Sequence, residues 1–501
     1  MSKNSHKEHL SSYLTKHRVK PRENDTRSKI PSKESGKVPA NEDKLAHTNS
    51  KTAGYKPIKR GKISIQDIPG EIMMTIFRYL SPQDLILASQ VCKSWHGLAN
   101  DNTLWRPILK KYMYSGTKSD RSDGEIKSKS IESLKKDCMT RCIQQRNKRV
   151  FRLLRKRKSP YTGLPESKEV EQALKTAGMT FELVMIDKDD REHTLRHQDV
   201  FYHPMSVSIR WFALELPPIN SIKEFQLYSR NPLFYNQETG KPVKEGPYQR
   251  SLLLTQELKW EDWKGKSIGG DELISLYSLP QGLTIAMYKG DEELAFVSFA
   301  LSLDNLVQKC IYGTPKEPFT TPDNKCVDPG MSTRHGLLGY QLTVQLRSLR
   351  KAHWDDQFRN IDCKDGSING GYAIFSVVRP DQRIKINIED SLYPWKTDAF
   401  KGKVKDVMVL DLTMLDEGSN VFWTASSLVK IERNKDISKM FDFDYRYDGI
   451  MSIEYADQKG KLYLQICKMD TGEMFLTNLT VRVALEVINE RFGTNYKSTD
   501  K

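Results

Sequence analysis

Residues 63–112 hold several short apolar stripes, close together in a chain of 501 residues. The first stripe follows Pro69, whose missing N–H suits the first turn of a helix. Its members recur at helical spacing: Ile72, Ile76, Phe77 and Leu80. About fifty residues are too few to bury a hydrophobic core of their own. We therefore expect this segment to dock on another surface.

Further short helices are predicted in the same segment. Ser81 is followed by Pro82 at the first helical position and by Asp84 at the third, which is the pattern of a capping box. Val91, Cys92, Trp95 and Leu98 form the next stripe, and Asn102 can cap a last helix that carries Leu104, Trp105, Ile108 and Leu109. Spacing alone also fits an ordinary helical subdomain packed on the rest of the chain.

The order of these residues resembles the F-box. Pro-x-Glu-Ile, Ile-Phe-x-x-Leu, Pro-x-Asp-Leu, Val-Cys-x-x-Trp and Leu-Trp follow one another between residue 63 and about residue 112. The resemblance implies a three-helix module that binds the Skp adaptor (S-phase kinase-associated protein 1) and, through it, cullin-1 of a ubiquitin ligase. Some of the implied contact residues must also form the small core of the module. They are Ile68, Pro69, Ile72, Ile76, Phe77, Leu80, Leu85, Val91, Trp95 and Trp105.

The net charge of +15 is unevenly distributed along the chain. Residues 1–160 contain 36 Lys and Arg against 15 Asp and Glu, a balance of +21, and the remainder carries −6. Residues 1–62 are rich in Lys, Ser, Asn and Glu, which predicts a disordered basic tail. Residues 113–160 are expected to form a basic helical linker, with an amphipathic helix over 131–154.

This basic helix is open to several interpretations. It could be a solvated spacer, a nuclear import signal, or a surface for nucleic acid or an acidic partner. Nucleic acid is disfavoured because no aromatic residues for base stacking are interleaved with the basic ones. Cys138 and Cys142 lie one helical turn apart, but no second pair with ligand spacing follows, so we expect no metal site.

From residue 161 onward the pattern becomes strand-like. We expect one helix over 166–177, ended by Gly178, and another over 480–491, closed by Gly493. Tyr340, Leu342, Val344 and Leu346 alternate with polar residues, which predicts a sheet with one solvated face. The other main predicted strands are 181–186, 207–216, 224–228, 283–288, 294–301, 407–415, 421–431, 450–455, 461–467 and 473–476.

About 340 residues are too many for one sandwich, and the prolines between 315 and 329 mark a loop that could divide two units. The predicted fold class is therefore α+β: a small helical F-box, a basic helical linker and two packed sandwich-like or barrel-like β-units, with a terminal helix. The expected domains are a tail at 1–62, the F-box at 63–112, the linker at 113–160, β-rich units at 161–330 and 331–496, and a short tail at 497–501.

No catalytic motif is found in the β-rich part of the sequence. Gly265-Lys266-Ser267 is similar to the end of a phosphate loop, but Trp260 occupies the position of the first glycine. We therefore expect no catalytic residues, no cofactor and no metal. The sequence contains no apolar run long enough to span a membrane and no secretory signal, so we expect an intracellular protein, in the cytoplasm, the nucleus or both.

Four blocks, at 160–165, 336–342, 395–400 and 488–494, are similar to F-box proteins of the "F-box only" group. The resemblance implies a substrate-recognition subunit of a Skp–cullin–F-box ubiquitin ligase, which holds a protein substrate through its β-rich region and is not itself catalytic. The alternative is an adaptor-bound scaffold without a ligase role. The identity of the substrate is not encoded in any motif of the sequence.

Overall fold

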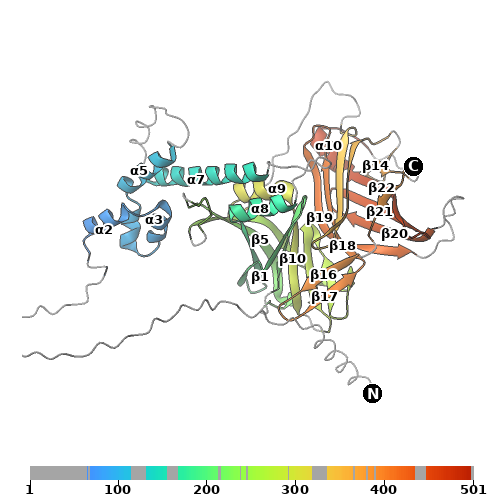
Figure 1. The fold of residues 1–501 in the computed structure, drawn as a ribbon, viewed down its shortest axis with the longest axis horizontal. Helices are drawn as coiled ribbons and strands as arrows, with labels where there is room; N and C mark the ends of the chain where they lie inside the picture. The colour runs from blue at the N-terminus through green and yellow to red at the C-terminus, as the bar shows by residue number, and fades with distance from the viewer. Residues whose placement is uncertain are drawn as a thin grey trace, which may run out of the picture.

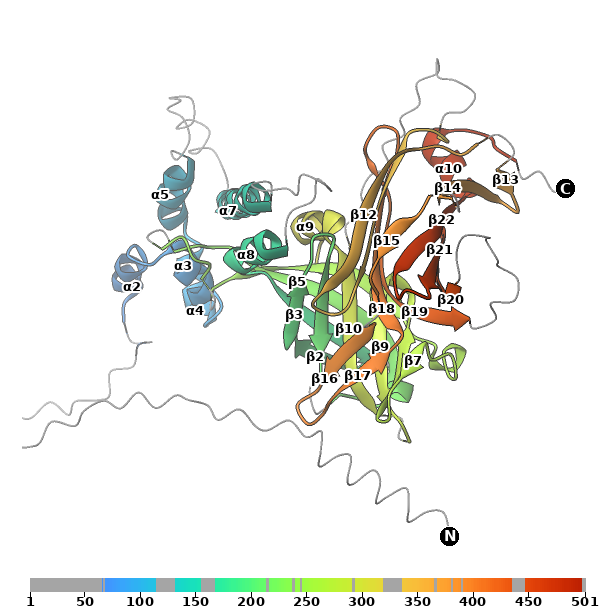
Figure 2. The same cartoon turned by 45° about the vertical axis from the view of Figure 1, so that its right-hand side comes forward.

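The computed structural model describes residues 65, 68–113, 131–154, 167–212, 216–236, 239–243, 246–290, 293–318, 336–364, 367–379, 382–388, 391–434 and 447–497. Short helices on one side of the molecule lead through a long helix to packed β-sheets on the other (Figures 1 and 2). This arrangement confirms the predicted α+β class. The predicted tail at 1–62 lies outside the described residues, as do parts of the predicted linker.

Helices occupy the N-terminal part and a few later positions. In the described residues the α-helices are α2 (Gly70–Phe77), α3 (Pro82–Ala88), α4 (Lys93–Ala99), α5 (Asn102–Met113), α7 (Ile131–Leu154), α8 (Ser167–Ala177), α9 (Leu303–Tyr312) and α10 (Leu485–Phe492). Short 3-10 turns are η3 (Ile219–Ser221), η4 (Trp260–Asp262) and η5 (Pro280–Gly282). No helix in the described part of the chain is long and apolar enough to cross a membrane.

Two sheets form a sandwich after α8. The four-stranded sheet has the order β2-β1-β5-β6, and the six-stranded sheet has the order β3-β4-β10-β9-β8-β7. Their facing sides, with α8 and α9, enclose one hydrophobic core. The strands are β1 (Thr180–Asp187), β2 (Glu192–Arg196), β3 (Asp199–Tyr202), β4 (Ser206–Trp211), β5 (Ile222–Pro232), β6 (Tyr248–Glu257), β7 (Gly269–Gly270), β8 (Ile274–Ser278), β9 (Leu283–Tyr288) and β10 (Leu294–Ser302).

A ten-stranded sheet follows, with the order β12-β11-β18-β19-β20-β21-β22-β14-β13 and β15 paired to β22. The long strand β19 pairs with β18 and then, further along, with β20, so it joins the two arms of this sheet. Both arms and α10 contribute to one core. The strands are β11 (Tyr340–Arg347), β12 (Ala352–Ile361), β13 (Ile368–Asn369), β14 (Tyr372–Val378), β15 (Ile384–Ile386), β18 (Val407–Leu415), β19 (Val421–Asn434), β20 (Tyr447–Ala456), β21 (Gly460–Met469) and β22 (Met474–Ala484).

The six-stranded sheet is the middle layer of the β-region. Its second face packs on β18, β19 and the two-stranded sheet of β16 (Leu392–Lys396) and β17 (Lys401–Lys405), through a separate core that includes Phe296, Trp395 and Val409. The six-stranded sheet therefore contacts one hydrophobic core on each of its two faces. The β-region is one continuous packed body.

Two expectations for this region need correction. The polar side of β11 is not solvated, because Thr343, Gln345 and Arg347 are buried, and Arg347 donates hydrogen bonds to Ser206 and Ser208 of the middle sheet. The predicted helix over 480–491 begins only at Leu485, because residues 480–484 continue β22 and place Val481 and Val483 in the core. The helix over 166–177 is confirmed as α8, and the left-handed backbone of Gly178 ends it.

Candidate functional site

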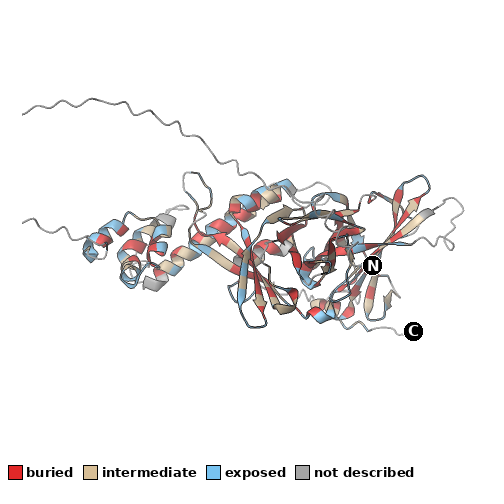
Figure 3. Cartoon of the chain, turned by 90° about the horizontal axis from the view of Figure 1, so that it is seen from below, coloured by how far each residue is buried: buried red, intermediate tan, exposed pale blue. Residues whose placement is uncertain are grey.

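Exposed apolar side chains are concentrated near the N-terminal helices. Eight large hydrophobic residues of the described chain are exposed, and six of these lie between residues 65 and 91. Figure 3 shows these helices at one end of the molecule, with exposed and buried positions interleaved. The six are Ile65 at 57%, Ile72 at 54%, Ile76 at 45%, Tyr79 at 87%, Leu87 at 40% and Val91 at 64% exposed. We call them the exposed apolar set.

The register of α2 separates its two apolar faces. Met73 and Phe77 are one residue beyond Ile72 and Ile76, and they are only 4% and 1% exposed. Because residues four apart share a helix face, one face enters the core and the neighbouring face presents two isoleucines outward. Phe77 is fixed by an edge-to-face contact with Trp95 of α4, with ring centroids 5.4 Å apart.

Local caps set the directions of the next helices. The Asp84 backbone N–H donates to Ser81 Oγ at 3.2 Å, which confirms the capping geometry predicted for α3. At α5 the cap is Asp101 and not Asn102, since the Thr103 backbone N–H donates to Asp101 Oδ1 at 2.7 Å. Hydrogen bonds from Thr103 hold the pKa of Asp101 below its ordinary value.

The core of the helical region is completed by distant parts of the chain. Trp105 is fully buried, and its Nε1–H donates to the Ala99 carbonyl at 2.7 Å. The same cluster contains residues of α7, including Leu134 and Cys138, and Leu233 and Phe234, which directly follow β5. The short helices therefore obtain their core from α7 and the β-region, in agreement with the expectation that they cannot enclose one alone.

Helix α7 joins this core to the sandwich. Leu134, near its start, packs in the helical core, and Val150, near its end, packs in the sandwich core. Arg146 is buried and donates from Nη2 to Gln249 Oε1 of β6 at 2.8 Å, and burial lowers its pKa. The Arg149 guanidinium lies over the Tyr235 ring, 5.1 Å from its centroid. Part of the basic helix thus serves packing.

Burial divides the ten residues implied by the resemblance into three groups. Pro69, Ile72, Ile76 and Val91 are exposed; Ile68, Leu80 and Trp95 are half-buried; Phe77, Leu85 and Trp105 are buried. Only the first two groups offer surface to a partner in this conformation, and the third holds the helices in place. Tyr79 and Leu87 were not among the ten, although both are exposed. Tyr79 lies outside the apolar stripe of α2, and Leu87 lies in α3, whose apolar residues occupy most sides of the helix. Helical spacing therefore did not identify either residue as exposed.

The short helices and their exposed apolar set define an F-box-like region, because residues 65–111 match the F-box-like family model. Along most of its length the chain is also similar to F-box only protein 15. Identity to that protein from Bos taurus is 28% over 451 residues, which cover 86% of this chain and 94% of the relative. For the Homo sapiens protein it is 28% over 447 residues, 86% of either chain.

A shorter similarity is confined to a small part of the chain. F-box/LRR-repeat protein 5 of Xenopus laevis is 43% identical over 70 residues, 13% of this chain and 9% of that protein. The predicted resemblance to F-box proteins, and to the "F-box only" group among them, is confirmed. The long matches extend well beyond the F-box-like region and must include much of the β-region.

Proposed function

We propose that this protein is the substrate-recognition subunit of a Skp–cullin–F-box ubiquitin ligase. The observation that carries the proposal is the concentration of exposed apolar side chains in a region that matches the F-box-like model. F-box proteins bind the Skp adaptor, which links them to cullin-1. The chemistry of ubiquitin transfer then belongs to other subunits, and this chain is not itself an enzyme.

In this proposal the adaptor covers the exposed apolar set. Ile72, Ile76 and Val91 supply the central contacts, because each is about half exposed or more. Full burial of an exposed isoleucine or valine side chain contributes roughly 1.5–3 kcal/mol, and these side chains, which are already partly buried, contribute about half of that each. Ile68, Pro69, Leu80 and Trp95 border these contacts. Phe77, Leu85 and Trp105 act indirectly, by holding the helices that present them.

The β-region is proposed to hold the protein substrate, and α7 to set its distance from the adaptor. A helix of 24 residues is about 36 Å long. Its packing in both cores favours a fixed orientation, which keeps a bound substrate near the activated ubiquitin and raises the effective concentration of its lysines. Such a role fits a protein of the cytoplasm or nucleus.

Charge inserted into the exposed apolar set tests adaptor binding. We expect Ile76→Asp together with Val91→Asp to weaken co-purification with the Skp adaptor by more than about tenfold, because the charges would be buried in the complex. The matched control is Val421→Asp, since Val421 is also exposed, at 37%, but lies in the β-region. Undiminished adaptor binding by the double variant would refute the assignment.

A second experiment separates a ligase subunit from a scaffold. Proteins bound by the full chain are tested for ubiquitination with the adaptor and cullin present. The ligase proposal expects ubiquitination to be lost when residues 63–112 are deleted and kept when residues 1–60 are deleted. If bound proteins are never ubiquitinated while the adaptor still binds, the scaffold alternative is the correct one.

A further inference from the structure

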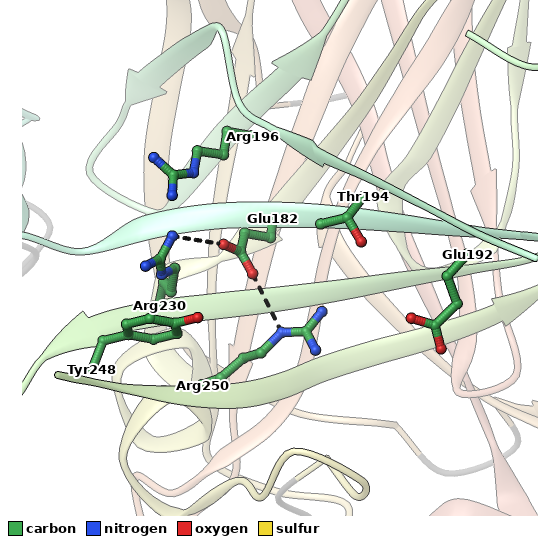
Figure 4. Close-up of a pocket in the computed structure, with 7 residues that line it drawn as sticks. All are labelled: Glu182, Glu192, Thr194, Arg196, Arg230, Tyr248 and Arg250. Carbon is green, nitrogen blue, oxygen red and sulfur yellow. Dashed lines mark hydrogen bonds and ion pairs between the residues drawn. The ribbon is translucent and has the colours of Figure 1, made fainter. Parts of the chain in front are cut away.

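The four-stranded sheet has a face that does not contribute to the sandwich core, and we call it the outer face. Along β1, Phe181, Leu183 and Met185 enter the core, so Glu182 points the other way. An open hollow of about 400 Å³ lies on this outer face. Figure 4 shows three arginines, two glutamates and a tyrosine among the side chains around it.

Two of these arginines are held in place by their neighbours. Arg230 of β5 and Arg250 of β6 are directly opposite in register, an unfavourable arrangement for like charges. Glu182 lies between them, 3.1 Å from Arg230 Nη1 and 3.3 Å from Arg250 Nε (Figure 4). Their guanidinium groups also lie over tyrosine rings, Arg230 at 3.5 Å from the centroid of Tyr248 and Arg250 at 3.7 Å from that of Tyr228.

The third arginine has no protein partner in the described chain. Arg196 of β2 is opposite Glu182 in register, and its exposed side chain makes no hydrogen bond or ion pair with a described residue. Each guanidinium has five N–H donors; Glu182 accepts a hydrogen bond from one donor of Arg230 and forms an ion pair with Arg250. The basic end of the outer face therefore has a charge of +2 after Glu182 is counted, and most of its donors remain available.

The opposite end of the same face is acidic. Glu192 of β2, Glu224 of β5 and Glu257 of β6 lie in one cross-strand row, with Ile186 of β1 between the first two. Along β2 the acidic row is four residues from Arg196, about 13 Å in an extended strand. Glu224 and Glu257 are again like charges directly opposite each other. The face thus has a basic end and an acidic end, each with an unfavourable internal pair.

We propose that the basic end of the outer face binds a phosphorylated side chain on a protein segment, and that the acidic row receives a lysine or arginine of the same segment. A phosphate group carries a charge of about −1.5 to −2 at pH 7, which matches the +2 of the site. Its oxygens accept the paired N–H groups of arginines, and the tyrosines and Glu182 hold two of these arginines ready. This proposal rests on the proposed function, and it specifies which substrates the β-region takes.

The charge pattern distinguishes this ligand from other anions. A continuous polyanion that crosses the face would meet three carboxylates in the acidic row, whereas a polypeptide can carry opposite charges about four residues apart. A single carboxylate would neutralise only half of the charge at the basic end. Between the two ends, Val184, Tyr228 and Leu252 are buried and form the floor of the face, so the contacts to the ligand come from the charged groups at its two ends.

The test uses the full chain and a short labelled peptide that carries one phosphoserine and, four residues away, one lysine. We expect the phosphorylated peptide to bind at least about tenfold tighter than its unphosphorylated form. Arg196→Ala should remove most of this difference without disturbing the fold, because Arg196 has no partner to lose. The matched control is Arg191→Ala, an exposed arginine at the other end of the same hairpin, which should bind like the unchanged protein.

Equal binding of the two peptides, or an Arg196→Ala variant that binds as tightly as the unchanged protein, would overturn the proposal. Vesicles of phosphatidylserine and inorganic phosphate are parallel arms, and Arg196-dependent binding to either without binding of the peptide also overturns it. Skp adaptor binding is measured on the same preparations. If the unchanged protein fails to bind the Skp adaptor but still prefers the phosphorylated peptide, only the proposed function is contradicted. If it binds the adaptor but binds both peptides equally, only this site is contradicted.

Discussion

The F-box-like region and the β-region expose and bury opposite kinds of side chain. The short helices leave six large apolar residues exposed, although they have few apolar residues available. The β-region instead encloses a charged pair, Arg347 and Asp411, whose side chains are 0% and 1% exposed. The difference indicates that the helices present an apolar surface for a partner to cover, whereas the β-region pairs these two buried charges with each other in its own interior.

The buried pair lies where the middle sheet meets the ten-stranded sheet. Arg347 Nε is 2.6 Å from Asp411 Oδ2, and its Nη2 donates to Ser206 Oγ at 2.8 Å and to Ser208 Oγ at 3.0 Å. Ser426 donates to the other oxygen of Asp411. Buried charges are tolerated when every group has a partner, and this network joins four strands of two sheets.

The largest effect is expected from breaking this pair. Arg347→Met leaves the Asp411 carboxylate buried without its cation, and should destabilise the β-region by about 3–5 kcal/mol. The double variant Arg347→Met with Asp411→Leu removes both charges and should recover much of that loss. The midpoint of chemical denaturation of the full chain, followed by tryptophan fluorescence, measures both. If the double variant is no more stable than the single one, the loss of stability does not come from the unpaired Asp411 carboxylate, and the prediction is wrong.

The next effect concerns the connection between the two regions. Gln144 is an exposed residue in the middle of α7. Gln144→Pro removes a helical hydrogen bond and clashes with the preceding turn, at a cost of about 3 kcal/mol. We expect α7 to kink or unwind, so that the distance between a dye on the F-box-like region and one on the β-region becomes broadly distributed in single-molecule energy transfer.

Gln144→Ala is the matched control for this variant, since alanine keeps the helix. Adaptor binding should survive in both variants, and ubiquitination of a bound substrate should fall only in Gln144→Pro. A narrow distance distribution in the proline variant would show that other contacts, such as those of Leu233 and Phe234, fix the orientation without α7.

The sequence predicted elements with a strong local pattern. The 24 residues of α7 have the predicted bounds, and the hairpin of β9 and β10 follows from its two apolar runs and their turn. The predicted solvated face of β11 was wrong for a physical reason. Alternation shows that one side of a strand is polar, but whether another sheet covers that side depends on Ser206 and Ser208, far away in the sequence.

The same limit applies to the candidate sites. Helical spacing predicted the apolar stripes of the F-box-like region, but Phe77 and Ile76 differ in burial because of tertiary neighbours. The arginines of the outer face lie on three different strands, and only strand pairing brings them together. Residues 480–484 became strand because Val481 and Val483 fill the core at a spacing of two, while the apolar residues of 480–491 also fit a helix.

The smallest expected effect is a pH dependence of stability that comes from a histidine of the β-region. His203 is buried beside the charged pair, and burial, followed by the positive charge of Arg347, lowers its pKa to about 3. An unfolded histidine titrates near 6.5, so between pH 6.5 and 3 the unfolded chain binds the additional proton. Stability must then fall as the pH decreases, by up to about 1.4 kcal/mol per pH unit from this residue.

We expect His203→Gln to flatten the decrease in melting temperature between pH 6.5 and 5. Asp411 does not contribute to the slope between pH 6.5 and 5. Burial alone would raise the pKa of Asp411, but Arg347 and the hydrogen bonds to the carboxylate hold this pKa below its ordinary value of 3.8. The stability that Asp411 contributes is therefore lost only at lower pH. His197, whose pKa burial also lowers, remains in the variant and leaves a residual slope. If the melting temperature decreases equally steeply with pH in both proteins, His203 is protonated inside the folded β-region. The interior of the β-region would then accept an additional charge without losing stability.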